Sequence, residues 1–186
     1  MKIFRYLKQY LKISLFLKFK KSYKKAFFIE QLTYSYIEKK DNNKKSLDIG
    51  CGLYPKNPFS AKYLYGVDLR EDLSHGIEIK KANLIFENLP YETNQFDFVT
   101  AFDCIEHIPR IISHNGKPKN SFIDLMNEIY RVLKPNGIFF HKTPAFPSSL
   151  AFQDPTHLNF ITENTFPNYF CLPNIEAKVN GYGFSG

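Results

Sequence analysis

Two carboxylates and two glycines in the first half of the chain have residue types and spacing suited to holding a ligand. Asp48, Gly50 and Gly52 occupy every second position of one stretch, and Asp68 follows Gly50 after 18 residues. Glycines spaced by one residue let the backbone turn tightly and let a ligand approach its N–H groups. A carboxylate at Asp68, near the end of an apolar run, can accept hydrogen bonds from both hydroxyls of a ribose. The pattern predicts a nucleoside-binding unit; an ordinary strand and turn with a surface aspartate is the plainer alternative. A dinucleotide site is not favoured, because no third glycine or alanine stands near Pro55.

Histidines and an acid in two later stretches could handle a proton. His107 follows an apolar run, and Asp154 precedes His157 by three residues. The imidazole of His157 could take a proton from a hydroxyl, and Asp154 could orient that ring if the loop turns. We therefore predict that His107, His157 and Asp154 line an acceptor pocket and act in catalysis. The alternative for His157 is a loop histidine bonded to the backbone.

The elements that must position these residues alternate between strands and helices. Strands are expected at 46–49 and 65–69, from residue 76 or 77 to 82, from residue 98, and at 138–144. A helix is expected to begin at Ser121, with a capping box to Asp124, and to end at 134–137. The polar segment 109–120 is expected to be a loop over the site. The alternation predicts an α/β fold, with a doubly wound, mainly parallel, Rossmann-like sheet and helices on both faces.

Several motifs occur in a fixed order between residues 44 and 145. They are Asp-x-Gly-x-Gly at 48–52, Gly-Val-Asp at 66–68, Leu-Pro-Tyr at 89–91, Glu-His at 106–107 and Arg-Val-Leu-Lys-Pro-Asn-Gly at 131–137. This set resembles the class I S-adenosylmethionine-dependent methyltransferases. The resemblance implies S-adenosyl-L-methionine as the cofactor and methyl transfer as the activity. The residues that it places around the cofactor are Asp48, Gly50, Cys51, Gly52, Asp68, Leu69, Asn83, Leu84 and Asp103.

The chain departs from the family pattern in three places. The crossover at 53–63 holds two prolines and has room for about two helical turns at most. Asn83 stands where the family commonly has an acid near the adenine. Residues 143–146 read Thr-Pro-Ala-Phe instead of the Asn/Asp-Pro-Pro-Tyr/Phe motif of amino-directed enzymes. Because this last motif is absent, we regard a nucleic-acid methyltransferase as the second choice.

The preferred acceptor is a hydroxyl or similar group of a small molecule, sugar or cell-surface glycan. The segment Asp-Pro-Thr-His at 154–157 is similar to one in bacterial methyltransferases of sugar and glycan pathways. Asp103, Glu106 and His107 also resemble the acid-Glu-His set of quinone-biosynthesis O-methyltransferases, some of which are treated as magnesium-dependent. The preferred prediction uses no metal. A non-catalytic, membrane-associated, cofactor-binding protein is a third possibility.

Charge is concentrated at the beginning of the 186-residue chain. Residues 1–25 hold nine of the 25 Lys and Arg residues and no acid. The sequence therefore predicts a basic, amphipathic, helical segment at 1–43, with a second helix at about 22–39, ahead of a methyltransferase domain at 44–186. The basic helix could contact an anionic membrane peripherally or pack on its own domain with a solvated lysine face. Lysines interrupt every apolar run, so no run in this segment is long enough to span a bilayer.

The remaining composition suits a cytoplasmic enzyme with one core. The three cysteines, Cys51, Cys104 and Cys171, have no Cys-x-x-Cys spacing, which fits a reducing cytoplasm and argues against a zinc or disulfide framework. The family normally ends in two further strands that make an antiparallel edge. Residues 175–182 could supply one, and the last edge strand is expected to be absent, either because the fold is clipped or because the sequence is incomplete.

Overall fold

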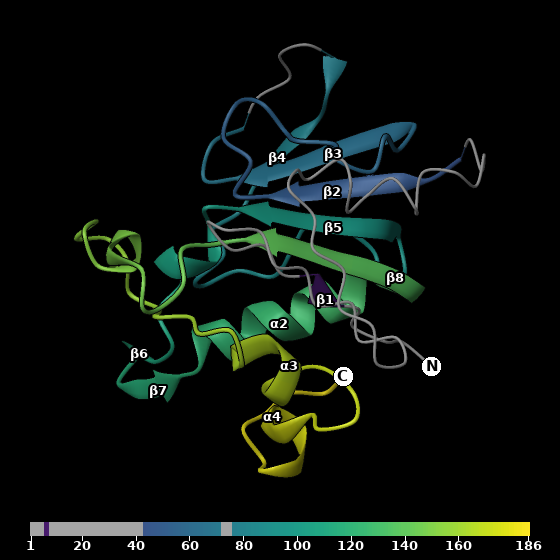
Figure 1. Ribbon diagram of the computed structural model, residues 1–186. Coiled ribbons are helices and arrows are strands. Elements are labelled where there is room, and N and C mark those ends of the chain that lie inside the picture. Colours follow the sequence, from purple (N-terminus) through teal and green to yellow (C-terminus); the bar gives the residue numbers. More distant parts are fainter. Residues whose placement is uncertain (1–5, 8–42, 72–75) are drawn as a thin grey trace.

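A parallel sheet organises the computed structural model, which describes residues 6–7, 43–71 and 76–186. The strand order among these residues is β1-β8-β5-β2-β3-β4, and each neighbouring pair runs parallel (Figure 1). The strands of this sheet are β1 (Tyr6–Leu7), β2 (Lys45–Ile49), β3 (Tyr63–Asp68), β4 (Ile79–Lys81), β5 (Phe96–Phe102) and β8 (Leu133–Lys142). The predicted parallel, doubly wound core is thereby confirmed.

Helices and a small hairpin complete the described chain. The α-helices are α2 (Ser121–Val132), α3 (Thr165–Tyr169) and α4 (Glu176–Val179). Short 3-10 helices are η2 (Ile105–His107) and η3 (Ser149–Ala151), and the antiparallel hairpin joins β6 (Ile112–His114) to β7 (Lys117–Lys119). None of the helices in the described part of the chain has the length and apolar character that a membrane span requires.

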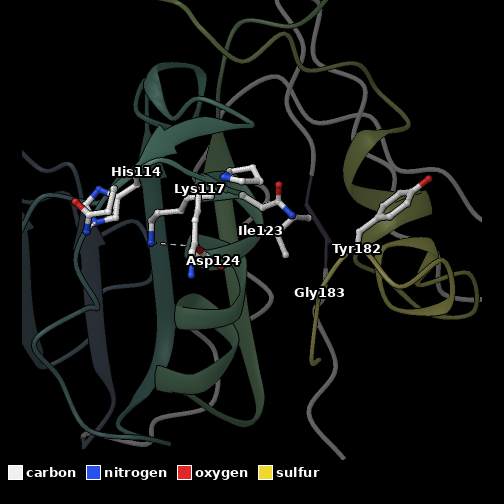
Figure 2. Close-up of a pocket in the computed structure, with 10 residues that line it drawn as sticks. His114, Lys117, Ile123, Asp124, Tyr182 and Gly183 are labelled. Carbon is white, nitrogen blue, oxygen red and sulfur yellow. Dashed lines mark hydrogen bonds and ion pairs between the residues drawn. The ribbon is translucent and has the colours of Figure 1, made fainter.

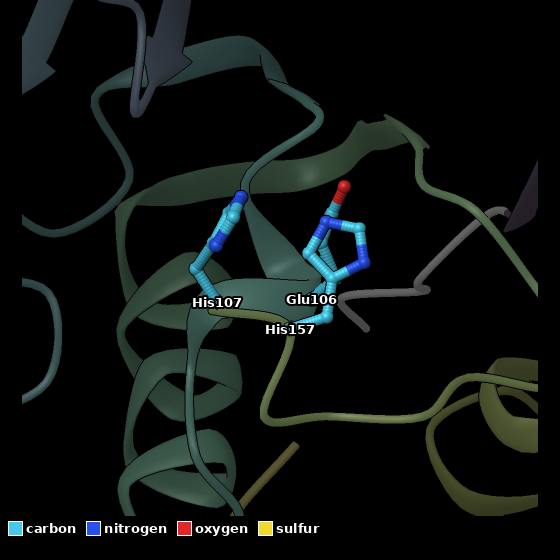
Figure 3. A group of neighbouring side chains, drawn as sticks. All are labelled: Glu106, His107 and His157. Carbon is cyan, nitrogen blue, oxygen red and sulfur yellow. The ribbon is translucent and has the colours of Figure 1, made fainter. Parts of the chain in front are cut away.

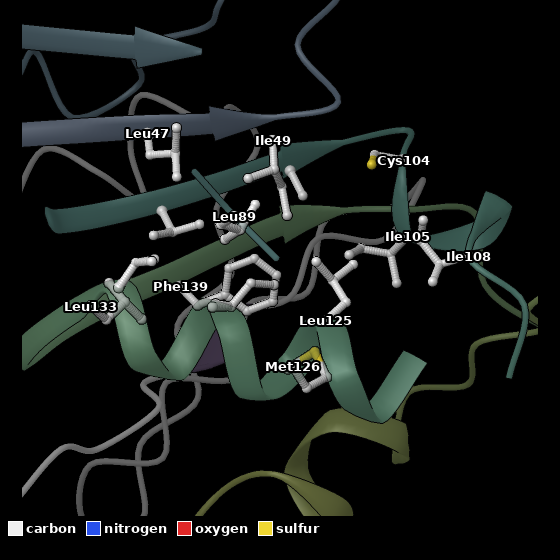
Figure 4. Packing of buried hydrophobic residues seen from close by; sticks show 14 of the residues in the cluster. Leu47, Ile49, Leu89, Cys104, Ile105, Ile108, Leu125, Met126, Leu133 and Phe139 are labelled. Carbon is white, nitrogen blue, oxygen red and sulfur yellow. The ribbon is translucent and has the colours of Figure 1, made fainter. Parts of the chain in front are cut away.

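The main core lies between the sheet and α2 (Figure 4). Central strand β2 is buried from Ser46 to Ile49, as expected for a strand with neighbours on both sides. Leu125, Met126 and Ile129 recur at helical spacing on α2 and are at most 3 % exposed, so this helix buries one face against the sheet.

Aromatic rings extend the packing on both faces of β8. Phe139 packs toward α3, where its ring centroid lies 6.2 Å from that of Phe166. Phe140 points to the opposite face, because successive strand residues alternate, and meets Phe59 at 6.1 Å. Phe59 also stacks on Phe98 at 4.2 Å. The segment after β2, predicted to hold up to two helical turns, contains turns only and still covers part of this second face.

The junction between α2 and β8 differs from the prediction. The helix ends at Val132, and Leu133 is already extended and paired with Phe96. The next sheet pair is Phe98 with Ile138, so residues 134–137 bulge out of β8 instead of terminating the helix. Asn136, at φ +64°, supports this bulge, because asparagine tolerates the left-handed region.

Two local predictions around α2 were wrong. The expected capping box is absent: no side chain caps the helix at Asn120, and Asp124 instead forms an ion pair with Lys119 at 3.0 Å. The segment before α2, expected to be a loop, contains the β6–β7 hairpin. Its turn residues Asn115 and Gly116 both have positive φ, a two-residue turn that matches the twist of antiparallel strands.

The ends of the described chain also correct the prediction. Residues 175–182 form α4 and its flanking turns, not a strand, and Val179 is 77 % exposed. Beside β8, the place of an edge strand is taken by β1, which pairs in parallel with Phe139 and Phe140. Tyr6 and Leu7 are therefore extended where an amphipathic helix was expected. The rest of that helix, and the second helix at about 22–39, lie outside the described residues. The domain boundary at residue 43 stays a prediction.

Candidate active site

The glycine turn follows β2 at the carboxyl edge of the sheet. Gly50 and Gly52 have φ of +62° and +61°, a region that L side chains rarely adopt. A Cβ on Gly50 would collide with the side chain of Cys104, whose own Cβ would lie 2.9 Å away. The Gly50 N–H donates to Val67 O at 2.8 Å, which ties the turn to β3. Backbone geometry therefore requires glycine at both positions, and close packing against Cys104 adds a second requirement at Gly50.

Asp68 ends β3 directly beside this turn. Its Oδ2 accepts from the Gly52 N–H at 2.9 Å, and its Oδ1 accepts from Arg70 Nε at 3.1 Å. The Asp68 side chain is 14 % exposed, whereas the Arg70 side chain is 63 % exposed. Arg70 is thus a solvent-facing partner of the Asp68 carboxylate. Sequence reasoning missed Arg70, although its position two residues after the acid was visible.

Asp48 lies below the turn and is nearly buried. Its Oδ1 accepts from Thr100 Oγ1 at 2.6 Å, and its Oδ2 accepts from the Lys56 N–H at 2.7 Å. Burial raises the pKa of Asp48 to about 6, although the hydrogen bonds from Lys56 and Thr100 oppose this rise. The carboxyl group joins β2, β5 and the segment after the glycine turn. Asp48 therefore positions the turn from beneath.

Three other predicted cofactor residues have identifiable surroundings. Cys51 is half-buried, and burial raises the pKa of its thiol to about 12, so it stays neutral and donates to Gly52 O at 3.3 Å. Asn83 begins a turn, with its Oδ1 accepting from the Ile85 N–H at 3.1 Å. Leu84 is partly buried against the core. Asn83 thus has a structural role in the turn, and its contact with the adenine stays a prediction.

Asp103 and Leu69 end their strands differently. Asp103 has φ +50° and directs a half-exposed carboxylate toward Lys142, whose Nζ lies 4.0 Å away. Leu69 is 61 % exposed immediately after Asp68 and offers apolar surface to a flat ring. Because β2, β3, β5 and β8 run in parallel, all of these positions share the carboxyl edge of the sheet, where open α/β sheets bind ligands.

Glu106, His107 and His157 come together at the same edge (Figure 3). One ligand-type atom from each residue lies within 4.8 Å of the others, and the two imidazole centroids are 4.9 Å apart. The first two residues lie in η2, just after β5. The loop that carries His157 is held to η2 because the Leu158 and Asn159 N–H groups both donate to Glu106 O, at 2.8 and 2.9 Å. The structure therefore brings together two of the three residues that were predicted to line an acceptor pocket.

The predicted orientation of His157 by Asp154 is not what the structure shows. His157 Nδ1 lies 3.2 Å from Ala151 O, whereas Asp154 Oδ2 is 3.9 Å from His157 Nε2, beyond hydrogen-bond distance. Asp154 instead accepts from the Thr156 hydroxyl at 2.6 Å and from the Thr156 N–H at 2.8 Å. These bonds lower the pKa of Asp154. Thr156 in turn contacts His107 Nδ1, so Asp154 is linked to His107 through Thr156.

A separate pocket of about 610 Å³ lies beside the hairpin (Figure 2). It is lined by β6, β7, the first turn of α2, Tyr182 and Gly183. None of the predicted site residues lines it. It is therefore not the nucleoside site predicted from the sequence.

The residues at the glycine turn fit S-adenosylmethionine. The Asp68 carboxylate lies beside the turn, where the predicted ribose contact needs it, and Leu69 is an exposed apolar side chain next to it. A Cβ on Gly52 would meet nothing closer than Arg70 Nη2 at 3.7 Å, so the approach to this glycine is open. A carboxylate, an exposed apolar side chain and an open glycine backbone thus lie at the same turn.

Comparison with known proteins agrees with this geometry. The family model described as a methyltransferase domain matches residues 22–185. The chain belongs to this methyltransferase family. A SAM-dependent methyltransferase from Archaeoglobus fulgidus superposes with a TM-score of 0.53 at 20 % identity, covering 75 % of this chain and 64 % of that one, which supports the fold.

Curated relatives share somewhat more sequence with this chain over the residues that align. A ubiquinone biosynthesis O-methyltransferase of Pseudomonas syringae pv. tomato is 27 % identical over 130 residues, covering 62 % of this chain and 51 % of the relative. A demethylmenaquinone methyltransferase of Bacillus mycoides is 26 % identical over 132 residues, again covering 62 % and 51 %. The chain spans about half the length of the curated relatives it matches.

Proposed function

We propose that this protein transfers a methyl group from S-adenosylmethionine to a hydroxyl group of a small-molecule acceptor. The observation that carries the proposal is the meeting of two sites at one sheet edge. The glycine turn and Asp68 follow β2 and end β3, while His107 follows β5. The family membership supports the cofactor assignment.

The cofactor supplies an electrophilic methyl group on a sulfonium sulfur. In this proposal Asp68 accepts from the ribose hydroxyls, and the Gly50–Gly52 turn holds the amino-acid end. Asp48 keeps that turn in place through Thr100 and the Lys56 N–H. Because the reaction needs an acceptor lone pair in line with the methyl group, positioning can supply roughly 7–11 kcal/mol of the barrier.

The histidine pair supplies the proton acceptor. Backbone carbonyls can only accept hydrogen bonds, so Nδ1 of His107 and Nδ1 of His157 carry the proton toward Thr156 O and Ala151 O. Each Nε2 then keeps its lone pair. A base in this position contributes about 10²–10⁴-fold to the rate for a hydroxyl acceptor.

More specifically, we propose that the acceptor is a sugar or glycan. Exposed aromatic rings follow β8: Phe152 stacks on Phe160 at 4.7 Å and meets Phe146 edge-on at 6.2 Å. All three are about half exposed. Flat aromatic surface of this kind suits a ring-shaped acceptor, and residues 158–160 follow His157 directly. A phenolic ring is the second candidate, favoured by the curated relatives named for O-methyl transfer in ubiquinone biosynthesis.

Labelled cofactor tests the proposal. The full chain is incubated with methyl-labelled S-adenosylmethionine and separate fractions of glycans, phenols, lipids and RNA. The proposal expects the label in a methyl ether formed at a hydroxyl group of a glycan or a phenol. The glycan and phenol fractions distinguish these two acceptor classes. Label in RNA alone would support a nucleic-acid methyltransferase. Tight binding of S-adenosylhomocysteine without transfer to any fraction would support a non-catalytic cofactor-binding protein.

A further inference from the structure

We propose that Glu106, His107 and His157 form a binding site for a divalent transition-metal ion, with zinc as the best match. One ligand atom from each residue lies within 4.8 Å of the other two. A tetrahedral zinc ion with donors at about 2.0–2.1 Å separates those donors by about 3.4 Å. Closing the remaining gap needs rotation of terminal side-chain torsions, which are broad for histidine and glutamate.

The backbone contacts of the two imidazoles indicate where each ring carries its proton. Nδ1 of His107 lies 3.2 Å from Thr156 O, and Nδ1 of His157 lies 3.2 Å from Ala151 O. These bonds place the ring proton on Nδ1 and leave Nε2 of each ring as a lone-pair donor. Histidines that bind metals usually donate their other ring N–H to a carbonyl or carboxylate in this way.

Glu106 provides an independent observation. The residue is 2 % exposed, and its Oε2 accepts from Thr143 Oγ1 at 2.5 Å. Its Oε1 is buried and has no hydrogen-bond partner among the described residues. A buried carboxylate oxygen without a donor is costly, because it has lost its water and gained nothing in return. A bound cation at the two Nε2 atoms would satisfy this oxygen.

The ligand types decide between metals. Two imidazoles and one carboxylate match zinc and similar borderline ions, whereas magnesium prefers an all-oxygen shell. Asp103, the third member of the acid-Glu-His set considered for magnesium, is absent from the cluster and faces Lys142. The proposed site therefore differs from the magnesium alternative in both its ion and its third ligand. It also differs from the preferred prediction, which used no metal.

Three protein ligands leave one coordination position open. An oxygen bound there has its pKa lowered by the ion, so an acceptor hydroxyl could lose its proton without a free imidazole base. Only this consequence rests on the proposed methyl transfer. Ion binding itself depends on the three side chains alone and can be measured without cofactor or acceptor.

Cobalt and zinc titrations test the site. Untagged full-length protein is stripped with chelator, dialysed and titrated with Co²⁺ under visible absorption, then with Zn²⁺ in a calorimeter. We expect one ion per chain, with intense tetrahedral Co²⁺ bands and without the thiolate charge-transfer band that the free cysteines would produce. Weak binding without saturation, or a thiolate band, would overturn the proposal.

Matched variants locate the ion. Glu106→Gln keeps the shape of the side chain and removes the charge, and His157→Ala removes one nitrogen; each should weaken Zn²⁺ binding at least 10-fold. Thr143→Val, which removes only the donor to Glu106, should weaken it about 10-fold. His114→Ala, a histidine of β6 outside the cluster, should have no effect. If Glu106→Gln fails to fold, the two remaining cluster variants His107→Ala and His157→Ala decide the outcome, and unchanged affinity in both would refute the site. Methyl transfer assayed separately in chelator reports on the proposed function alone.

Discussion

The pH dependence of stability should report the buried carboxyl group of Asp48. The group is 2 % exposed, and burial raises its pKa from 3.8 to about 6. Because the folded pKa lies above the unfolded one, folding favours the protonated form. The associated stability is fully present below about pH 3.8 and is lost as the pH rises through about 6.

The size of this effect follows from the two pKa values. For a single site with pKa 3.8 unfolded and about 6 folded, the stabilisation lost between about pH 5 and pH 8 is about 1.4 kcal/mol. For a chain of this length that corresponds to about 3–6 °C in melting temperature. Other groups also titrate in this range, so the quantity to compare is the difference between the native protein and a variant.

Asp48→Asn isolates the contribution. The amide oxygen can still accept from Thr100, but the amide nitrogen cannot accept from the Lys56 N–H, which adds a cost that does not depend on pH. We expect the free energy of unfolding of the native protein to fall relative to that of Asp48→Asn by about 1.4 kcal/mol between those pH values. Urea titrations at several pH values measure this difference. Asp124→Asn, at a half-exposed carboxylate, controls for the loss of one charge. Parallel pH profiles for the native protein and Asp48→Asn would refute the reasoning.

Three further predictions concern the cofactor, the histidine pair and the basic segment. Asp68→Ala should weaken S-adenosylhomocysteine binding about 10–100-fold in calorimetry, because a charged acceptor is lost; unchanged affinity would remove the ribose assignment. His157→Ala, assayed in chelator, should lower turnover about 10²–10⁴-fold while cofactor affinity stays the same; joint loss of melting temperature and cofactor affinity would instead indicate a structural role. If residues 1–25 contact membranes, each Lys or Arg near the surface adds about 1 kcal/mol on anionic lipid, so flotation should require anionic vesicles and fade with salt; equal flotation on neutral vesicles would contradict this.

The central strands were predictable because each is a short apolar run, which indicates a buried strand. Leu47 and Ile49 on β2, and Val99 on β5, are completely buried, and each lies in an apolar run bounded by polar residues. Such runs are typical of strands with neighbours on both sides. The glycine turn was equally predictable, because only glycine adopts the positive φ of this turn without a steric cost.

The ends of the fold were less predictable because their patterns are ambiguous. Ile175, Ala177 and Val179 alternate as in a strand, yet only Ala177 is fully buried and the segment is helical. Four residues can satisfy either period by chance. The two-residue β1 is too short to show a strand period of its own, and it pairs with the edge of β8 that β5 does not occupy.

The histidine cluster shows which part of a site follows from topology and which does not. Parallel strands put the ends of β5 and β8 at one edge, so the approach of the two stretches was predictable. On a strand, however, consecutive Glu106 and His107 side chains would point to opposite faces. They share a site because β5 gives way to η2, where three residues complete a turn and neighbours are about 120° apart. The burial of Glu106 depends in turn on the loop at 157–159, which follows η2 after about fifty residues. The Leu158 and Asn159 N–H groups of this loop donate to Glu106 O. No local pattern encodes that contact, so the buried, unpartnered oxygen that points to a metal ion could be found only in the folded structure.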